Sequence, residues 1–162
     1  MITGGVITVS DKGSRGERED LSGRDVIRIL ADLPIRIDAY EIIPDEKEAI
    51  QDKIREYADR KHLDLVVTTG GTGVSPRDVT PDATLEILEK ELPGMAEAMR
   101  RKSMEKTPHA MISRAVAGIR GQCLIINLPG SPKGARENLE VILPALKHAI
   151  EKIKGDPSDC GS

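Results

Sequence analysis

The segment 68–73, Thr-Thr-Gly-Gly-Thr-Gly, has the residue types of a phosphate-binding turn. Its three glycines let the backbone turn tightly and let a ligand approach the main chain closely. Successive amides in such a turn form a concave anion site, to which Thr69 and Thr72 would add hydroxyl donors. No Gly-Lys-Ser/Thr follows, so the segment is not a Walker loop, and it does not match the dinucleotide-binding fingerprint. A plain strand-ending turn would use the same residues, so neighbouring residues must decide.

A guanidinium and two carboxylates follow the glycines, at Arg77, Asp78 and Asp82. Asp82 fits the N-cap of the next helix. Asp78 has no such structural use, and a carboxylate beside an anion-binding turn is repelled unless a cation lies between them. Proteins commonly hold Mg²⁺ through one or two carboxylates together with substrate phosphates. We therefore predict a Mg²⁺ site at Asp78, the alternative being a surface ion pair between Arg77 and Asp78.

Three other polar segments stand where strands are expected to end. Ser10 and Asp11 follow the first apolar run, and they either finish that strand or join the edge of a site. Asp45 follows a later strand, where capping of the next helix explains it without a ligand. Segment 127–133 leads into the last helix, whose free N-terminal amides could bind a phosphate, although its prolines also fit a purely structural helix start.

The elements that must position these residues alternate between strands and helices. Apolar runs predict buried strands at 4–10, 62–69 and 122–128, with an alternating strand nearer an edge at 35–43 and a weak strand at 113–119. Apolar residues at helical spacing predict helices capped by Ser22 and by Asp45, and further helices over 82–91, 94–105 and 132–154, the last kinked at Pro144. This alternation predicts parallel β-α-β units, whose strand ends would bring the polar segments to one edge of a sheet, where such folds bind ligands.

The composition disfavours several classes of protein. The chain has 162 residues and a net charge of −3, and Tyr40 and Tyr57 are its only Phe, Tyr or Trp residues, so it offers neither the basic surplus nor the stacking platforms of a nucleic-acid binder. Its apolar stretches are too short to span a membrane, and no signal segment is visible. Cys123 and Cys160 do not suggest a disulfide framework, so we expect a cytoplasmic location. Neither a nucleophile elbow nor a Cys–His arrangement is present, which favours phosphate chemistry by positioning and electrostatics.

In combination and in order, these motifs resemble the MogA/MoaB family of molybdenum cofactor biosynthesis proteins. The resemblance covers roughly residues 5–153 and rests on five runs: Val-Ser-Asp-Lys-Gly-Ser-Arg-Gly (9–16), Ile-Pro-Asp-Glu (43–46), the glycine-rich segment (68–73), Arg-Asp-Val-Thr-Pro-Asp-Ala-Thr (77–84) and Asn-Leu-Pro-Gly-Ser-Pro-Lys (127–133). It implies a three-layer α/β/α molybdopterin-binding domain with a mostly parallel sheet. It also implies transfer of AMP from ATP to molybdopterin with release of pyrophosphate. The intact run 77–81 resembles the MogA type, whereas the short chain resembles the MoaB type.

The resemblance also implies roles for single residues. It makes Asp45 and Asp78 the catalytic aspartates, which replaces the capping role otherwise expected for Asp45. The expected substrate and nucleotide contacts come from all the strand ends: Ser10, Asp11, Thr69, Gly70, Gly71, Thr72, Gly73, Asp82, Asn127, Pro129, Gly130 and Ser131. In this hypothesis Asp78 positions Mg²⁺ on the ATP phosphates, the glycine-loop amides orient them, and Asp45 helps to hold the pterin phosphate in line.

We expect one domain over residues 1–155, assembled as a homotrimer, and a flexible tail at 156–162. The expected partners are molybdopterin and ATP, with a molybdenum-insertion protein as a candidate downstream. Two alternatives remain open. One is a molybdopterin carrier without catalysis, and the other is a nucleotide-cleaving domain related to competence-damage proteins, whose chains are usually longer.

Overall fold

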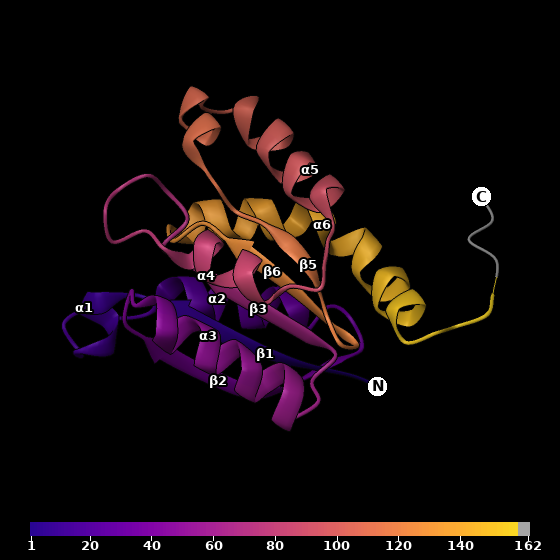
Figure 1. Cartoon of the computed structure of the whole chain (residues 1–162). Coiled ribbons are helices and arrows are strands. Elements are labelled where there is room, and N and C mark those ends of the chain that lie inside the picture. Colours follow the sequence, from indigo (N-terminus) through magenta and orange to yellow (C-terminus); the bar gives the residue numbers. More distant parts are fainter. Residues whose placement is uncertain (159–162) are drawn as a thin grey trace.

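A six-stranded sheet in the order β2-β1-β3-β6-β5-β4 forms the centre of the molecule (Figure 1). The computed structural model describes residues 1–158. Its strands are β1 (Ile2–Val9), β2 (Ile35–Ile43), β3 (Leu65–Thr69), β4 (Lys90–Glu91), β5 (Ala117–Arg120) and β6 (Cys123–Leu128). Neighbours from β2 to β6 run parallel, whereas β5 pairs antiparallel with both β6 and β4. The predicted mostly parallel sheet is confirmed, with β2 at an edge as expected.

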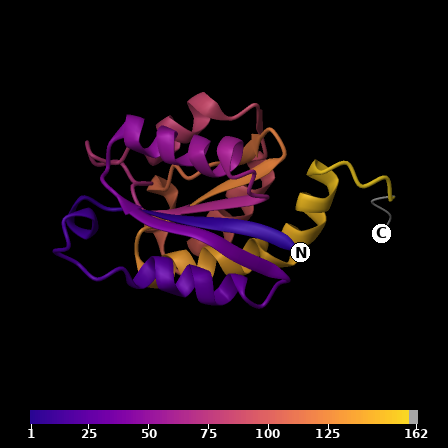
Figure 2. The same ribbon diagram turned by 90° about the horizontal axis from the view of Figure 1, so that it is seen from below.

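Helices cover both faces of the sheet, so the predicted three-layer α/β/α fold is confirmed (Figure 2). The helical elements are α1 (Asp11–Ser14), α2 (Leu21–Leu30), α3 (Lys47–Arg55), η1 (Glu56–Arg60), α4 (Thr80–Ile87), α5 (Pro93–Met104), η2 (Pro108–Ile112) and α6 (Pro132–Ile153). Helices α3 and α4 pack on one face, while α2, α5 and α6 pack on the other. Within residues 1–158, no helix combines the length and apolar character that a membrane crossing requires.

Alternate residues of the central strands fill two hydrophobic cores. Val67 and Ile126 contribute to the core beneath α2 and α6, whereas Val66 and Ile125 contribute to the core beneath α3 and α4. All four side chains are fully buried. Because successive side chains of a strand point to opposite faces, a strand covered on both faces needs apolar residues at every position. This explains the continuous apolar runs of β3 and β6.

The register of the parallel strands brings their carboxyl ends to one edge of the sheet. Val9 of β1 lies opposite Ile43 of β2, and Thr69 of β3 lies opposite Leu128 of β6. Thr69 also lies opposite Thr8, so the ends of β1 and β3 are level within one residue. The segments that follow these four strands therefore start side by side, as the alternation of elements predicts.

Two of the predicted helix caps are wrong. Asp45 does not cap α3, whose N-cap residue is Glu46 and makes no side-chain capping bond. Asp20, rather than Ser22, caps α2, because its Oδ1 accepts a hydrogen bond from the amide of Gly23 at 2.9 Å. The segment from Asp11 to Asp20 contains the short helix α1, which Ser10 caps. The aspartates near these helix starts thus have partners that capping rules alone do not anticipate.

The helix predicted over 82–91 is present, but its bounds and Asp82 as its cap are wrong. Helix α4 starts at Thr80, with Pro81 in its first turn, so Asp82 lies inside the helix. The backbone becomes extended at Leu88, and Lys90–Glu91 then forms β4, which pairs with β5.

The last helix, α6, starts at Pro132, where the amide of Gly134 donates to Ser131 Oγ at 3.0 Å. Pro144 lies inside α6, and the ribbon changes direction along the helix (Figure 2). Of the predicted tail at 156–162, residues 156–158 are non-helical and residues 159–162 lie outside the described part.

Candidate active site

A cleft of about 500 Å³ opens at the carboxyl edge of the parallel strands. The loops that follow β1, β2, β3 and β6 all contribute to its walls. Eight of the predicted site residues line it: Ser10, Asp45, Thr69, Gly70, Gly71, Asp78, Gly130 and Ser131. Six others do not line it: Asp11, Thr72, Gly73, Asp82, Asn127 and Pro129. The cleft therefore unites segments from the whole length of the sequence, and the six remaining residues require a separate account.

The glycine-rich loop after β3 has a backbone that only glycine tolerates at two positions. Gly70 and Gly71 have φ angles of 106° and 68°, in the region that side chains disfavour. A Cβ on Gly70 would overlap the carbonyl oxygen of Val9, and one on Gly71 would overlap Thr80 Oγ1. The Gly70 amide donates to the Leu128 carbonyl at 3.0 Å, which ties the loop to β6. The loop therefore passes close against its neighbours and presents bare backbone to the cleft.

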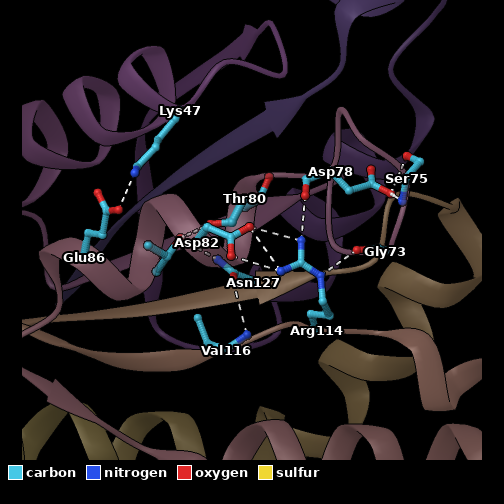
Figure 3. A network of polar contacts seen from close by, with 11 residues as sticks. Lys47, Gly73, Ser75, Asp78, Thr80, Asp82, Glu86, Arg114, Val116 and Asn127 are labelled. Carbon is cyan, nitrogen blue, oxygen red and sulfur yellow. Dashed lines mark hydrogen bonds and ion pairs between the residues drawn. The ribbon is translucent and has the colours of Figure 1, made fainter.

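Asp78 folds back onto the glycine-rich loop. Its Oδ2 accepts hydrogen bonds from the Ser75 amide at 3.0 Å and from Ser75 Oγ at 2.7 Å (Figure 3). A Cβ on Gly73 would lie 2.8 Å from the same oxygen. The other carboxylate oxygen has no hydrogen-bond partner within residues 1–158, so it is free to bind a ligand. Arg77 pairs with Asp11 rather than with Asp78, so the alternative of an Arg77–Asp78 ion pair is wrong.

Asp45 is held by reciprocal hydrogen bonds with Asp11. The Asp11 amide donates to Asp45 Oδ2 at 2.9 Å, and the Asp45 amide donates to Asp11 Oδ1 at 3.0 Å. Arg77 adds a two-pronged contact, because its Nε and Nη2 donate to the two Asp11 oxygens at 3.0 and 2.9 Å. The loops after β1, β2 and β3 are thereby joined through one chain of charged groups. Asp11 thus supports Asp45 without lining the cleft.

The electrostatic surroundings shift these two carboxyls in opposite directions. The hydrogen bond from Arg77 is the main cause that holds the pKa of Asp11 below its ordinary value. Burial is the main cause that raises the pKa of Asp45, and the negative charges of Asp11 and Asp78 raise it further. The hydrogen bond from the Asp11 amide opposes this rise. Asp45 and Asp78 are thus close enough for their charges to interact in the cleft.

The lining of the cleft is acidic. It contains four carboxylates, on Glu19, Asp20, Asp45 and Asp78, and one cationic side chain, on Arg18. Such a lining repels phosphate groups unless cations neutralise part of its charge. A polyphosphate would therefore enter this cleft most favourably together with a divalent metal ion.

Asp20 is a cleft residue that the sequence does not single out. Its Oδ2 accepts hydrogen bonds from Thr8 Oγ1 at 2.6 Å and from the Tyr40 hydroxyl, while its Oδ1 accepts from the Gly23 amide. Burial, and next to it the contact with Asp20, raises the pKa of Tyr40 to about 12. Ser22 Oγ donates to the Gly130 carbonyl at 2.6 Å, which joins α2 to the turn before α6. The sequence does place Asp20 three residues before Gly23 at the start of a helix, a spacing that would have predicted it as the helix cap.

Most predicted residues outside the cleft lining support the loops from behind. Asn127 is fully buried, and its amide nitrogen donates to Thr68 Oγ1 at 3.0 Å and to Thr84 Oγ1 at 3.1 Å, while its oxygen accepts from the Val116 amide at 3.3 Å. Pro129 supplies a carbonyl that accepts from Thr69 Oγ1 at 2.6 Å. The carbonyls of Thr72 and Gly73 both accept hydrogen bonds from Arg114, at 2.8 Å each. Asp82 pairs with the same arginine at 3.1 Å (Figure 3).

A second cleft, of about 240 Å³, lies between α5, η2 and the start of α6. Ser131 lines both clefts, so the two adjoin at the N-terminus of α6. Arg100 and Lys106 line the second cleft together with the polar side chains of Ser103 and Ser113. Lys106 pairs at 3.1 Å with Glu137, which lines the same cleft, so the second cleft combines cationic and acidic side chains.

The oxygen donors of the first cleft fit Mg²⁺. The described residues include no group of three or more acidic, His or Cys side chains that could hold a metal by themselves. Mg²⁺ rarely uses such a cage, and binds instead through one or two carboxylates and substrate phosphates. Within residues 1–158, Asp78 has an unpaired oxygen at the cleft, and the carboxylate of Asp45 lines the same cleft. These two carboxylates are the groups of the first cleft that would hold a phosphate-bound cation.

Comparison with known proteins finds relatives that match nearly the whole chain. A family model described as "Probable molybdopterin binding domain" matches residues 5–148. Molybdopterin adenylyltransferase of Helicobacter pylori is 44% identical over 155 residues, covering 94% of this chain and 88% of the relative. The protein of the same name from Escherichia coli is 40% identical over 149 residues, covering 90% and 76%. The crystal structure of the molybdopterin biosynthesis enzyme MoaB from Thermus thermophilus has a TM-score of 0.92 and 53% identity, covering 98% of this chain and 100% of that one.

The match of the family model, the near-complete alignment with these relatives and the shared fold lead to one conclusion: the chain belongs to the MogA/MoaB family of molybdopterin-binding domains.

Proposed function

We propose that the protein is a molybdopterin adenylyltransferase, which transfers AMP from ATP to the phosphate of molybdopterin and releases pyrophosphate. One observation supports this most directly: Asp45 and Asp78 face the same cleft as the bare backbone of the glycine-rich loop. The relatives named molybdopterin adenylyltransferase align over 94% and 90% of this chain. No side chain in the proposal forms a covalent intermediate, so catalysis relies on alignment and charge stabilisation.

Each part of the first cleft has a role in this proposal. The amides of the glycine-rich loop bind and orient the ATP phosphates. Asp78 holds Mg²⁺ through its unpaired oxygen, and the metal supplies neutralisation of the phosphate charge. Asp45, fixed by Asp11 and Arg77, keeps the attacking phosphate of molybdopterin in line with the α-phosphate. The glycine-rich loop and Asp78 follow β3, whereas Asp45 follows β2, so the fold itself sets the spacing between them.

The two adjoining clefts suit the two substrates. Adenylyl transfer requires both substrates to meet at one point, and the clefts meet at Ser131, where α6 begins. The N-terminus of a long helix favours negative charge, and α6 has 22 residues. We place ATP with its metal ion and the phosphate of molybdopterin in the acidic cleft, beside Asp45, and the pterin part of molybdopterin in the second cleft.

The test of the proposed function uses Asp78→Ala. We expect the parent protein, given molybdopterin, ATP and Mg²⁺, to form adenylylated pterin and pyrophosphate, both measured by chromatography. Asp78→Ala should abolish this turnover, because it removes the free carboxylate oxygen at the metal position. Binding of molybdopterin, followed by its fluorescence, should largely survive. The control is Asp52→Ala, which removes an exposed carboxylate of α3 and should leave turnover unchanged.

Two results would contradict this account. Turnover at the parental rate in Asp78→Ala would refute the role of Asp78 in holding a metal. Tight pterin binding by the parent protein without any pyrophosphate release would instead identify a carrier. The homotrimer and a downstream molybdenum-insertion partner stay predictions that rest on the resemblance. The cytoplasmic location and the domain bounds of 1–155 stay predictions that rest on the sequence pattern.

A further inference from the structure

Arg114 makes an unusual set of contacts behind the glycine-rich loop (Figure 3). Its Nε donates to the Gly73 carbonyl at 2.8 Å and its Nη2 donates to the Asp78 carbonyl at 2.6 Å. Its Nη1 donates to both carboxylate oxygens of Asp82 at 3.1 Å, and its own backbone amide donates to the Thr72 carbonyl at 2.8 Å. Arg114 thus joins three places: the end of the glycine-rich loop at Thr72 and Gly73, the turn at Asp78, and the first turn of α4.

The contacts of Arg114 with Gly73 and Asp78 enclose a segment of the chain that has little other support. The chain from Gly73 to Asp78 forms an excursion whose residues 74–77 are exposed, so little packing fixes its shape. Arg114 binds carbonyls at both ends of this excursion, which sets the distance between the glycine backbone and the residue whose carboxylate reaches the cleft. A planar guanidinium can make these bonds at once because its donors point in fixed directions.

An ordinary surface ion pair would not explain this arrangement. The side chain of Arg114 is 37% exposed and that of Asp82 is 51% exposed, and an isolated pair of this kind contributes little to stability. The same guanidinium also binds two backbone carbonyls, which an ordinary ion pair does not do. In this view Asp82 orients the guanidinium, and the guanidinium in turn positions the loop.

We propose that Arg114 is a positioning residue for the nucleotide and metal site, holding Asp78 and the glycine-loop amides in the geometry that binds metal-complexed ATP. The proposal rests on the proposed function of the cleft. Arg114 does not line the cleft, so it acts through the Gly73 and Asp78 backbone rather than by touching substrate. Asp82, expected from the resemblance to contact substrate, has the supporting role of holding Arg114.

The experiment compares Arg114→Lys and Arg114→Ala with a matched control, Arg120→Lys. Arg120 also pairs with an aspartate, Asp59, and donates to a backbone carbonyl, that of Ile87 at 2.9 Å. It lies at the opposite end of the sheet, where β5 meets the start of β6. A loss of stability that Arg114→Lys and Arg120→Lys share therefore measures the cost of removing an arginine and its contacts. Any further loss of turnover or metal binding in Arg114→Lys is specific to the first cleft.

We expect Arg114→Lys to lower turnover at least about tenfold and Arg114→Ala about a hundredfold, because a misplacement of about 1 Å in a catalytic group can cost that much. The Mg²⁺ concentration for half-maximal turnover should rise in both, and calorimetry should show weaker binding of Mg²⁺ with ATP. Binding of molybdopterin should stay near the parental value. Arg120→Lys should show a similar change in melting temperature without these effects.

Asp82→Ala separates positioning from simple charge pairing. If the carbonyl contacts matter, this variant should lose much less turnover than Arg114→Ala, since the guanidinium retains its bonds to Gly73 and Asp78. Equal losses would overturn the proposal in favour of a plain ion pair. Parental turnover and metal dependence in Arg114→Lys would overturn it as well.

Hydrogen exchange provides a readout that does not require turnover. The Ser75 amide donates to Asp78 Oδ2, and the Asp78 amide donates to the Ser75 carbonyl at 2.9 Å. Both amides should exchange faster in Arg114→Lys than in the parent or in Arg120→Lys. Unchanged exchange would refute the positioning role even in an active enzyme. If the parent shows no turnover but exchange rises, the proposed function fails while the positioning of the loop stands.

Discussion

Asp45 is subject to opposing influences within a few bonds of one another. Its backbone and side chain are both paired with Asp11, which orders it, while burial and the charges of Asp11 and Asp78 disfavour its ionised form. A carboxylate that acts on a phosphate substrate must be ionised and well placed. The structure achieves the placement at the expense of stability, which is common at functional sites.

Replacing Asp45 by Asn should stabilise the protein at neutral pH. Because folding raises the pKa of Asp45, ionisation weakens the parent fold as pH rises through that pKa, whereas Asn remains neutral. The gain should shrink as pH falls and should vanish near about pH 3, where the carboxyl is protonated in both states. Thermal unfolding with a chelator present, at several pH values, measures this. A variant less stable than the parent at neutral pH would contradict it.

Asp11→Asn is the matched control, with the opposite sign. Folding lowers the pKa of Asp11, so its ionised form stabilises the fold above its unfolded pKa, and this contribution is lost as pH falls through the folded value. Asp11→Asn should therefore melt below the parent at neutral pH, with the difference disappearing in acid. The same sign for both variants would contradict the assignment of their surroundings.

The role of a single residue could be predicted from the sequence only where its neighbours in the chain themselves indicated a ligand site. Asp78 was deduced from its place beside a glycine-rich turn, and the structure puts it in the cleft. Asn127 and Asp82 were expected at the substrate, yet they bind Val116, Thr84 and Arg114. These partners come from other elements of the fold, so local sequence could not reveal that the residues support the loops from behind.

At the scale of elements, the glycine-rich loop depends on close contact as well as on backbone freedom. Gly70→Ala should destabilise the protein by about 3 kcal/mol, from the disfavoured φ angle together with overlap of the Val9 carbonyl. Gly121→Ala separates these causes, because Gly121 has a φ of 60° but nothing within 4 Å of an added Cβ. It should cost only about 1 kcal/mol. Denaturant unfolding measures both, and equal losses would mean that contact at Gly70 is unimportant.

Strands and helices differed in how clearly the sequence indicated them. Strands β3 and β6 were predictable because burial on both faces demands unbroken apolar runs. Strand β4 was missed because its two residues, Lys90 and Glu91, are exposed and polar, so only their backbone pairing with β5 defines it. The cap of α2 was misassigned because Asp20 and Ser22 compete for that role, and the cap of α3 because Asp45 pairs with Asp11, which the local sequence does not reveal.

At the scale of the whole molecule, the parallel sheet gathers acidic and phosphate-binding groups at one edge. Because the first cleft has four carboxylates and one cation, ATP and Mg²⁺ should bind it together far better than either does alone. We expect both ligands in combination to raise the melting temperature. A ligand at about 100 times its Kd stabilises a fold by about 2.7 kcal/mol, which corresponds to several degrees for a chain of this size.

Differential scanning measurements test this prediction with ATP alone, Mg²⁺ alone and the two combined. Asp78→Ala should lose most of the combined shift, while Asp52→Ala should retain it. A full shift with ATP in the presence of a chelator would show that the acidic lining needs no cation.

The position of β6 in the middle of the sheet has a consequence for synthesis on the ribosome. Strand β6 pairs with β3, yet it is made after most of the other strands and helices. Until it emerges, β3 is an open edge whose apolar strand and unpaired backbone groups are exposed. The growing chain therefore passes through a stage at which it can associate wrongly with other chains. At that stage it also lacks Gly130 and Ser131, so the wall that the turn before α6 gives to the first cleft is still missing.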